Sequence, residues 1–393
     1  MAEEIQENKA FLKEQLITYI GNKRSLLPFI GQGVQFVQNQ LGQQKLDCLD
    51  LFSGSGVVAR YLKQFARSIC VNDLELYSSI INNCYLSNLA PQELTELENL
   101  HKNLTAKIDL ELVKIDEFRK NGKYEHPGFI SRLYSPQDIN NIQKEERCFY
   151  TPYNANYLDI ARQLINSEIP QKYRCYFIAP LLSEASIHAN TAGIFKGFYK
   201  NSKTKTGQFG GNGKNALSRI TGKISLQMPV QSVFNCDYKV FSTDANSLVN
   251  DDQLYSLTKD GTFDLVYLDP PYNQHPYGSN YFMLNLVASY KEPNEQNISR
   301  VSGIPNDWNR SNYNKKRKVS EVFLNLVKSV RAKYVLISFN SEGFLTKDEM
   351  VQMFSTCGKV NVLESNYNTF RGSRNLNARD IHVKEYLFVI EKS

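Results

Sequence analysis

The sequence predicts an α/β protein built around one mostly parallel sheet that a long insertion interrupts. Three observations predict it: five short apolar runs flanked by turn or helix-start signals, a glycine-rich turn directly after the first run, and a long stretch between the second and third runs. The chain has 393 residues, of which 41% are hydrophobic and 12% aromatic, so it can bury a sizeable core. A usual domain has about 150 residues, so we expect one domain with an insertion, or two domains.

The five runs are short and apolar, as strands buried in a parallel sheet are. They cover residues 46–52, 68–71, 238–241, 263–268 and 333–339. Two further runs, 360–363 and 385–390, come last with no convincing helix between them, which predicts an antiparallel hairpin at one sheet edge. We therefore expect seven strands, the last of them antiparallel.

Between the second and third runs lies a stretch of 157 residues, from 79 to 235, that contains no further such run. A parallel crossover with its helix needs only about a dozen residues, so we expect an inserted domain here and a core made of residues 1–78 and 236–393. Residues 92–143 have the spacing of amphipathic helices, whereas 186–235 are rich in Gly, Asn, Ser, Thr and Lys and predict a loop-rich surface. A helix is also expected near residues 320–330.

Charge and cysteine content limit the partners. There are 46 Lys and Arg against 40 Asp and Glu, and the net charge of +6 permits a polyanionic partner without requiring one. The seven cysteines form no CxxC pair and have no histidine spacing typical of zinc, so we expect free buried thiols, no metal and a reducing compartment. With a polar start and no long apolar run, the sequence predicts a cytoplasmic protein of a bacterial or archaeal type of cell, with no membrane partner.

The segment Asp50-Leu-Phe-Ser-Gly-Ser-Gly56 follows the first predicted strand and opens a helix. Glycines at such a turn let the backbone approach a bound nucleotide-like ligand, although they are also common in purely structural turns. The acid Asp50 disfavours a dinucleotide, and hence a dehydrogenase, because a carboxylate repels pyrophosphate. It suits the cationic amino group and sulfonium of S-adenosylmethionine.

The second predicted strand ends in Asn72-Asp73, 17 residues after Gly56. Acids about 20 residues after such a turn bind ribose hydroxyls in nucleotide-binding folds, so Asp73 is the ribose candidate. The alternative interpretation is that Asp73 caps a helix beginning at Leu74.

The fourth predicted strand ends in Asp269-Pro270-Pro271-Tyr272. In open α/β sheets ligands bind at the carboxyl ends of strands. The prolines stiffen the loop and leave carbonyl acceptors free, Asp269 adds another acceptor, and Tyr272 offers a flat stacking surface. An exocyclic amine on an aromatic ring, such as that of adenine, fits this corner. Hydrogen bonds from the amine to Asp269 and the Pro270 carbonyl would free the nitrogen lone pair to attack a methyl group.

With these motifs the chain resembles the Dam-like class of adenine-N6 site-specific DNA methyltransferases. The matching segments are residues 18–24, 50–56, 72–73, 242–245 and 269–272. The resemblance implies a Rossmann-like methyltransferase sheet with a large inserted DNA-recognition domain, and S-adenosylmethionine as cofactor. It implies methyl transfer to N6 of a flipped-out adenine in double-stranded DNA within a restriction-modification system, and allows a cognate restriction endonuclease as partner.

The motifs and the resemblance together assign the site residues. The cofactor residues are Tyr19, Lys23, Asp50, Phe52, Ser53, Gly54, Gly56, Asp73, Asp244 and Ala245. The resemblance puts Tyr19 and Lys23 at the cofactor end of the pocket, Phe52 and Gly54 on its floor, and Asp244 at the cofactor's adenine. The catalytic residues are Asp269, Pro270, Pro271 and Tyr272.

Residues 185–236 contain seven basic residues and no acid, which predicts a surface for phosphates. The expected DNA contacts are Lys196, Lys200, Lys203, Lys205, Lys214, Arg219 and Lys223, together with Tyr281, Arg371 and Arg374. Tyr281 is expected to sandwich or replace the displaced base, because an adenine must leave the duplex to react. A merely solvated basic face is the alternative interpretation.

Other functions stay open at this point. Related corners act on cytosine N4, and some RNA enzymes use Asp-Pro-Pro. A nucleic-acid-binding protein on a methyltransferase scaffold, without catalysis, belongs to a different class. Radiolabelled methyl transfer into DNA separates these possibilities, since only an active enzyme incorporates the label.

Overall fold

The computed structural model describes residues 6–14, 16–211, 213, 216–368 and 382–393. Its centre is a seven-stranded sheet in the order β3-β2-β1-β4-β5-β7-β6. The strands are β1 Leu46–Asp50, β2 Ala66–Asn72, β3 Asp237–Phe241, β4 Phe263–Leu268, β5 Ala332–Asn340, β6 Gly358–Asn368 and β7 His382–Lys392. Strands β1 to β5 pair in parallel, and β7 runs antiparallel to β5 and β6. The predicted seven-stranded α/β sheet with an antiparallel hairpin at one edge is confirmed.

Two predictions about the strands need correction. β3 was expected to be buried, but it is the edge strand beside β2, with Asp237 exposed and the rest half-buried. An edge strand lacks a neighbour on one side, so less of its surface is covered. β1 ends at Asp50, two residues before the predicted end, because Leu51 already belongs to the glycine turn.

Helices cover both faces of the sheet. α2 (Leu27–Leu41) and α3 (Val57–Lys63) pack on one face around Val34, Leu62 and Leu336. On the other face lie α10 (Ala245–Leu248), α13 (Val319–Ser329) and α14 (Lys347–Phe354). α13 confirms the helix predicted near residues 320–330. Its apolar side chains Phe323 and Leu326 face the sheet and are fully buried, as the amphipathic spacing requires.

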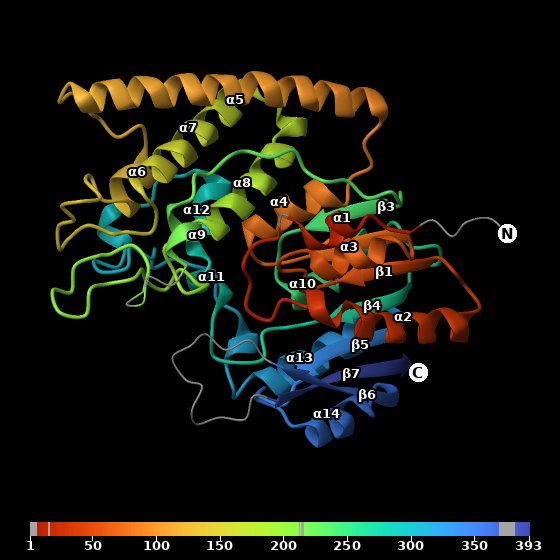
Figure 1. The fold of residues 1–393 in the computed structure, drawn as a ribbon. Coiled ribbons are helices and arrows are strands. Elements are labelled where there is room, and N and C mark those ends of the chain that lie inside the picture. The colour runs from red at the N-terminus through yellow and green to blue at the C-terminus, as the bar shows by residue number, and fades with distance from the viewer. Residues whose placement is uncertain (1–5, 15, 212, 214–215, 369–381) are drawn as a thin grey trace.

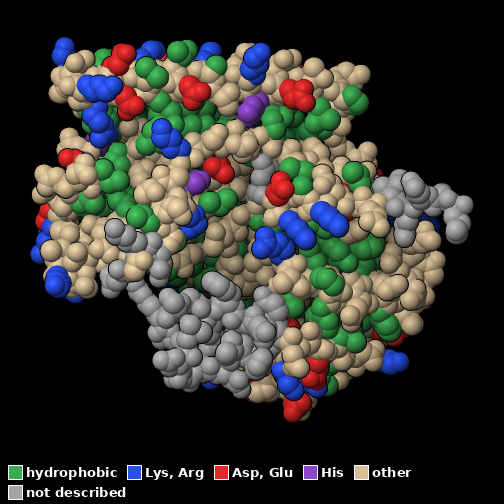
Figure 2. All heavy atoms as spheres, viewed as in Figure 1, with side chains coloured by type: hydrophobic (Ala, Val, Ile, Leu, Met, Phe, Trp, Pro, Cys, Tyr) green, Lys and Arg blue, Asp and Glu red, His purple; other side chains and the backbone are tan. Residues whose placement is uncertain are grey.

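A helical layer adjoins the sheet. Its members are α4 (Leu76–Tyr85), α5 (Pro91–Lys120), α6 (Phe129–Tyr134), α7 (Pro152–Glu168), α8 (Cys175–Ile187) and α12 (Phe282–Ser289). In Figure 1, α6, α7, α8 and α12 lie together to the left of the strands, with α5 along the top. α5 buries Leu97, Leu104 and Ile108 on its inner side, while Figure 2 shows acidic and basic side chains mixed along its outer surface. After α8 the chain forms loops, as predicted, and the short α9 (Leu217–Thr221), which was not predicted.

One apolar core joins helices of the predicted insertion, residues 79–235, to α12, which lies outside it in the sequence. Met283 and Leu284 of α12 are fully buried in the same cluster as Leu158 of α7 and Leu181 of α8. The predicted start of the insertion, residue 79, falls inside α4. The division into a core and an inserted recognition domain therefore stays a prediction.

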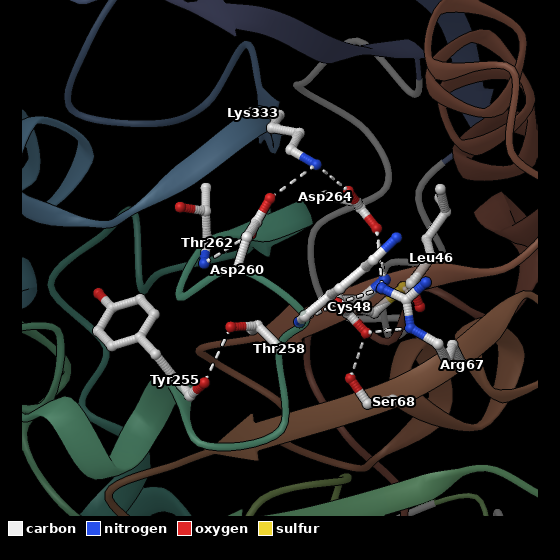
Figure 3. Close-up of polar contacts among 12 residues, drawn as sticks. Leu46, Cys48, Arg67, Ser68, Tyr255, Thr258, Asp260, Thr262, Asp264 and Lys333 are labelled. Atoms are coloured by element: carbon white, nitrogen blue, oxygen red, sulfur yellow. Dashed lines mark hydrogen bonds and ion pairs between the residues drawn. The ribbon is translucent and has the colours of Figure 1, made fainter.

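The amino ends of β1 and β4 meet in a network of charged groups (Figure 3). Asp47 accepts hydrogen bonds from Arg67 Nε (3.0 Å), Arg67 Nη2, Ser68 Oγ (2.6 Å) and a backbone N–H at residue 259 (2.9 Å). Asp264 accepts from the N–H of Asp47 (2.9 Å) and from Lys333 Nζ (2.8 Å). All four carboxylate oxygens of these two buried acids thus have a partner.

Within the described residues, no helix has the length and apolar character needed to cross a bilayer. The same part of the chain has no cluster of three or more side chains able to hold a metal ion. All seven cysteines are free thiols.

Candidate active site

A pocket of about 900 Å³, part of it open to solvent, lies at the carboxyl ends of β1, β2 and β4. Its walls come from six stretches of sequence within residues 19–23, 50–58, 72–75, 243–245, 267–278 and 309–314. It brings together the predicted residues Tyr19, Lys23, Asp50, Phe52, Ser53, Gly54, Asp73, Asp244, Ala245, Asp269 and Pro271. Gly56, Pro270 and Tyr272 lie outside the pocket lining.

The turn after β1 depends on its glycines. Gly54 and Gly56 have φ angles of 52° and 76°, in the left-handed region that other residues rarely adopt. A Cβ on Gly54 would lie 2.8 Å from the ring of Tyr19. The N–H of Gly54 donates to Asp73 Oδ2 at 2.7 Å, so the acid at the end of β2 fixes the turn after β1.

Asp73 is not the helix cap of the alternative interpretation. α4 begins at Leu76, and Glu75 occupies the N-cap position. Asp73 Oδ1 instead accepts from the N–H of Glu75 at 2.9 Å, inside the turn before the helix. Burial raises the pKa of Asp73 to about 6, against the effect of its backbone hydrogen bonds.

Asp50 is a buried acid whose carboxylate receives no hydrogen bond of good geometry within the described chain. It is 1% exposed. Burial, with the charge of Asp269 adding to it, raises the pKa of Asp50 well above its usual value, and weak contacts with the Phe52 N–H and the Ser53 hydroxyl partly oppose this. Buried polar groups in proteins are nearly always satisfied, so an unsatisfied carboxylate facing a pocket fits a positively charged ligand.

Asp269 forms an ion pair with Lys23, whose Nζ lies 3.1 Å from Asp269 Oδ1. The Lys23 ammonium balances the charge of this oxygen, although the contact lacks the angles of a good hydrogen bond. Burial is the largest effect and lowers the pKa of Lys23, but Asp269, Tyr272, Glu385 and Tyr267 together outweigh it and hold the pKa well above the usual value. Burial raises the pKa of Asp269, and Lys23 partly opposes this. Lys23 Nζ also lies 5.6 Å from the centre of the Tyr272 ring.

The pair was not foreseen. The sequence assigned Lys23 to the cofactor end of the pocket and Asp269 to the target end, and nothing in either motif shows that the two side chains meet. Ile20 precedes the lysine by three residues and is held by two tyrosines. Tyr277 Oη donates to the Ile20 carbonyl at 3.2 Å, and the Ile20 N–H donates to Tyr281 Oη at 2.7 Å.

Tyr281 requires a correction. It was expected to touch the displaced base or the DNA, but its side chain is fully buried. Its ring stacks on Tyr19, with centroids 4.8 Å apart and planes at 25°, and its hydroxyl is held by Ile20. In this position Tyr281 supports the pocket from behind and offers no surface to DNA.

The sequence missed several residues of the pocket. Glu75 is 3% exposed, and burial raises its pKa to about 7. Tyr313 packs edge-on against Phe52, with ring centroids 5.1 Å apart, and Asn309 lies near the end of β2. Glu75 follows Asp73 by two residues and could have been suspected, whereas Asn309 and Tyr313 lie in a long connection without a pattern.

The charge of the pocket is strongly negative. Five carboxyl groups line it, those of Asp50, Asp73, Glu75, Asp244 and Asp269, against the single ammonium group of Lys23. Asp244 is exposed at the start of α10, where it caps the helix by accepting from the N–H of residue 247 at 3.0 Å. An acidic pocket with buried, unsatisfied oxygens favours a cationic ligand over a phosphate-bearing one.

Five of the predicted DNA-binding lysines are exposed: Lys196, Lys200, Lys203, Lys205 and Lys223. Lys200 pairs with Gly207 in an antiparallel bridge, so three of them lie on one tight turn. The prediction that Arg219 contacts DNA needs correction. Its guanidinium is half-buried and donates to the backbone carbonyls of residues 187, 189 and 191. It holds the end of α8 and is not free for phosphates. Lys214, Arg371 and Arg374 lie outside the described residues.

Comparisons with known proteins agree with this geometry. The family model of D12 class N6 adenine-specific DNA methyltransferases matches residues 19–353. The type II methyltransferase M.NlaIII of Neisseria lactamica is 27% identical over 379 residues, covering 96% of this chain and all of that protein. M.CviAII of Paramecium bursaria Chlorella virus 1 is 27% identical over 380 residues, covering 95% of this chain and 98% of that protein. M.FokI of Planomicrobium okeanokoites is 26% identical over 385 residues, covering 95% of this chain and 52% of its own. The chain therefore belongs to the D12 class of N6 adenine-specific DNA methyltransferases.

Proposed function

We propose that this methyltransferase moves a methyl group from S-adenosylmethionine to N6 of an adenine flipped out of duplex DNA, as the modification enzyme of a restriction-modification system. One observation carries the proposal. Asp50 ends β1, Asp269 follows the last residue of the neighbouring strand β4, and both line the same pocket. The buried oxygens of Asp50 receive no hydrogen bond of good geometry within the described residues, whereas Asp269 is paired with Lys23. An unsatisfied acid beside an acid that a lysine keeps charged suits a cationic methyl donor next to an amine acceptor.

The cofactor end is the part of the pocket around Asp50. S-adenosylmethionine, when bound, supplies an electrophilic methyl group on a sulfonium. Asp50 would accept from its amino group, and the oxygens of Asp73 from its ribose hydroxyls. Phe52, with Asp244 and Ala245 at the rim, would hold its adenine. These residues fit a cation, since Asp50 is buried with no donor of its own.

The target end is the corner at Asp269. Lys23 now lies against this carboxylate and keeps it oriented. The amine of the incoming adenine would donate to Asp269 and to the Pro270 carbonyl, which draws the nitrogen toward tetrahedral geometry and frees its lone pair. The ring of Tyr272, half-buried against Phe339 with centroids 5.4 Å apart, is placed to stack on the base.

Duplex DNA would contact the exposed lysines of residues 196–223. Extruding a base costs a few kcal/mol, which phosphate contacts and stacking offset. The names of the relatives, type II methyltransferases and modification methylases, support a role in restriction-modification with a cognate endonuclease acting on the same site.

Tritiated methyl transfer from S-adenosylmethionine into DNA tests the proposal. We expect label in duplex DNA, recovered as N6-methyladenine at a defined sequence, which sequencing of modified bases would reveal. Salt-sensitive DNA binding without any incorporation would support a binding protein instead. Label recovered as N4-methylcytosine, or only in RNA, would also contradict the proposal.

The DNA surface has its own test. Replacing Lys200, Lys203 and Lys205 together by Ala should reduce the salt dependence of DNA binding, by roughly 0.9 in the log–log slope for each phosphate that the protein no longer neutralises. Lys102, Lys114 and Lys120 of α5 provide the matched control triple. An unchanged slope in the first triple, or an equal change in both, would remove this turn from the interface.

A further inference from the structure

Glu75 is a buried acid in the pocket wall to which the proposed reaction gives no role. It stands at the N-cap of α4, two residues beyond Asp73, and its side chain is 3% exposed. It lines the pocket together with Gly278 and Asn309, which come from a distant part of the chain. Burying a carboxylate is costly, so its contacts should explain its presence.

Those contacts tie two parts of the chain together. Glu75 Oε2 accepts from the side-chain amide of Asn285 on α12 and, at 3.3 Å, from that of Asn309. Asn309 Nδ2 also donates to the Leu74 carbonyl at 3.0 Å, and the Tyr77 N–H donates to Asn285 Oδ1 at 3.3 Å. The end of β2 and the first turn of α4 are thereby fastened to the segment that follows Asp-Pro-Pro-Tyr.

Gly278 shows how close this approach is. A Cβ on Gly278 would lie 2.6 Å from the carbonyl oxygen of Asn309 and 3.2 Å from Glu75 Oε1, so only glycine fits without displacing backbone. Its neighbour Tyr277 lines the pocket and bonds the Ile20 carbonyl. Glu75 therefore lies where three segments of the pocket wall meet.

We propose that Glu75 is a positioning residue that holds the segment after the catalytic corner against the methyl-donor side of the pocket. The inference rests on the proposed function, because it assigns Glu75 to the wall of that same site. Oε2 of Glu75 accepts from two side-chain amides. The pocket wall therefore needs a hydrogen-bond acceptor at this position, and the acceptor does not need to be charged. Glutamine can supply that acceptor, and alanine cannot.

The test measures the Kd of S-adenosylhomocysteine by calorimetry, and kcat and KM for DNA, in Glu75→Ala and Glu75→Gln. We expect Glu75→Ala to raise the Kd about tenfold and to lower kcat, because the hydrogen bonds to this carboxylate are removed. KM for DNA should not change, and Glu75→Gln should stay within about twofold of the wild type. Ser79→Ala is the matched control, since the Ser79 hydroxyl bonds only its own helix, at the Leu76 carbonyl.

Asn309 provides a second arm. It is exposed, so Asn309→Ala should fold even if Glu75→Ala does not. We expect Asn309→Ala to raise the Kd in the same direction and to add little to Glu75→Ala, as coupled partners do. Wild-type binding by Glu75→Ala, or by Asn309→Ala where Glu75→Ala does not fold, would overturn the inference. The inference would also be overturned if Glu75→Gln raised the Kd of S-adenosylhomocysteine as much as Glu75→Ala does while Asn309→Ala left this Kd unchanged. Glu75 would then act on the ligand directly. A wild-type protein that neither binds nor methylates would instead refute the proposed function.

Discussion

Aspartates lie near both ends of strands β1 and β4, in opposite circumstances: Asp47 and Asp264 near the amino ends, Asp50 at the end of β1, and the half-buried Asp269 directly after β4. At the amino ends, every carboxylate oxygen of Asp47 and Asp264 accepts a hydrogen bond (Figure 3). At the carboxyl ends, both oxygens of Asp50 lack a hydrogen bond of good geometry among the described residues, and Asp269 has an ion pair with Lys23 whose hydrogen-bond geometry is poor. The same residue type, on the same two strands, is thus fully hydrogen-bonded at one end and not at the other.

The difference separates stabilising groups from ligand-binding groups. A buried carboxylate with donors on each oxygen contributes to the stability of the fold, whereas one without donors costs stability. Proteins keep such a cost where a ligand supplies the missing partner. Substitutions at the two ends should therefore have opposite effects on stability and on activity.

The largest expected effect is at Asp269. Asp269→Ala should reduce kcat about a thousandfold, as the loss of a principal transition-state hydrogen bond does, with little change in DNA affinity. Tritiated methyl transfer and a DNA-binding titration measure the two quantities. Asp264→Ala, at the other end of the same strand, is the control and should keep its kcat per folded molecule. Near-wild-type rates from Asp269→Ala would remove this residue from the active site.

Asp47→Asn should destabilise the protein by about 2–3 kcal/mol. Breaking a buried ion pair costs about 3–5 kcal/mol, and the value here is smaller because the Arg67 side chain is 42% exposed and can regain water. Urea unfolding measures the change, and kcat of the folded enzyme should not move. A variant as stable as the wild type would show that the network of Figure 3 contributes nothing measurable.

Asp50→Asn should change the free energy of unfolding in the opposite direction to Asp47→Asn. Removing an unpartnered buried acid should stabilise the ligand-free protein by about 1 kcal/mol, and should weaken methyl-donor binding about tenfold or more. Urea unfolding and calorimetry with S-adenosylhomocysteine measure the two changes. Destabilisation together with unchanged binding would mean that the carboxylate serves the fold.

The pH dependence of these two variants sharpens the comparison. The folded pKa of Asp50 is raised, so its cost exists at neutral pH and disappears below the unfolded value of about 3.9, where both states are protonated. Burial alone would raise the pKa of Asp47, but hydrogen bonds from Arg67 and Ser68 lower it. Its contribution is therefore present above about pH 3.9 and declines as pH falls through the lower folded pKa. Stability curves of both variants that stayed parallel to the wild type from about pH 7 to about pH 3.5 would contradict this.

Much of the fold could be predicted because a short run of apolar residues is enough to indicate where each buried strand lies. The run at 263–268 is apolar throughout and became β4, the central strand next to β1. The misjudged strand had a visible signal, since Asp237 and Lys239 alternate with Tyr238 and Val240, the pattern of a half-exposed strand. The core that α12 shares with α7 and α8 could not be predicted from the sequence, because it depends on contacts between segments far apart in the chain.

The site was predictable where one short motif carries the chemistry, as at Asp269 and Asp50. It was not predictable where two motifs meet. Lys23 looked like a cofactor residue until it was placed against Asp269, and Tyr281 looked like a base-stacking residue until its burial behind Tyr19 was known. Arg219 could not be told from its lysine neighbours by charge, because its carbonyl partners lie at the end of α8 and just after it, about 30 residues earlier in the chain.

The six stretches that wall the pocket begin at residue 19 and finish at residue 314. During translation, a nascent chain lacks part of the pocket wall until residues 309–314 have left the ribosome. An incomplete polypeptide thus lacks a complete pocket. Affinity for the methyl donor would accordingly report the completion of folding across about three-quarters of the chain.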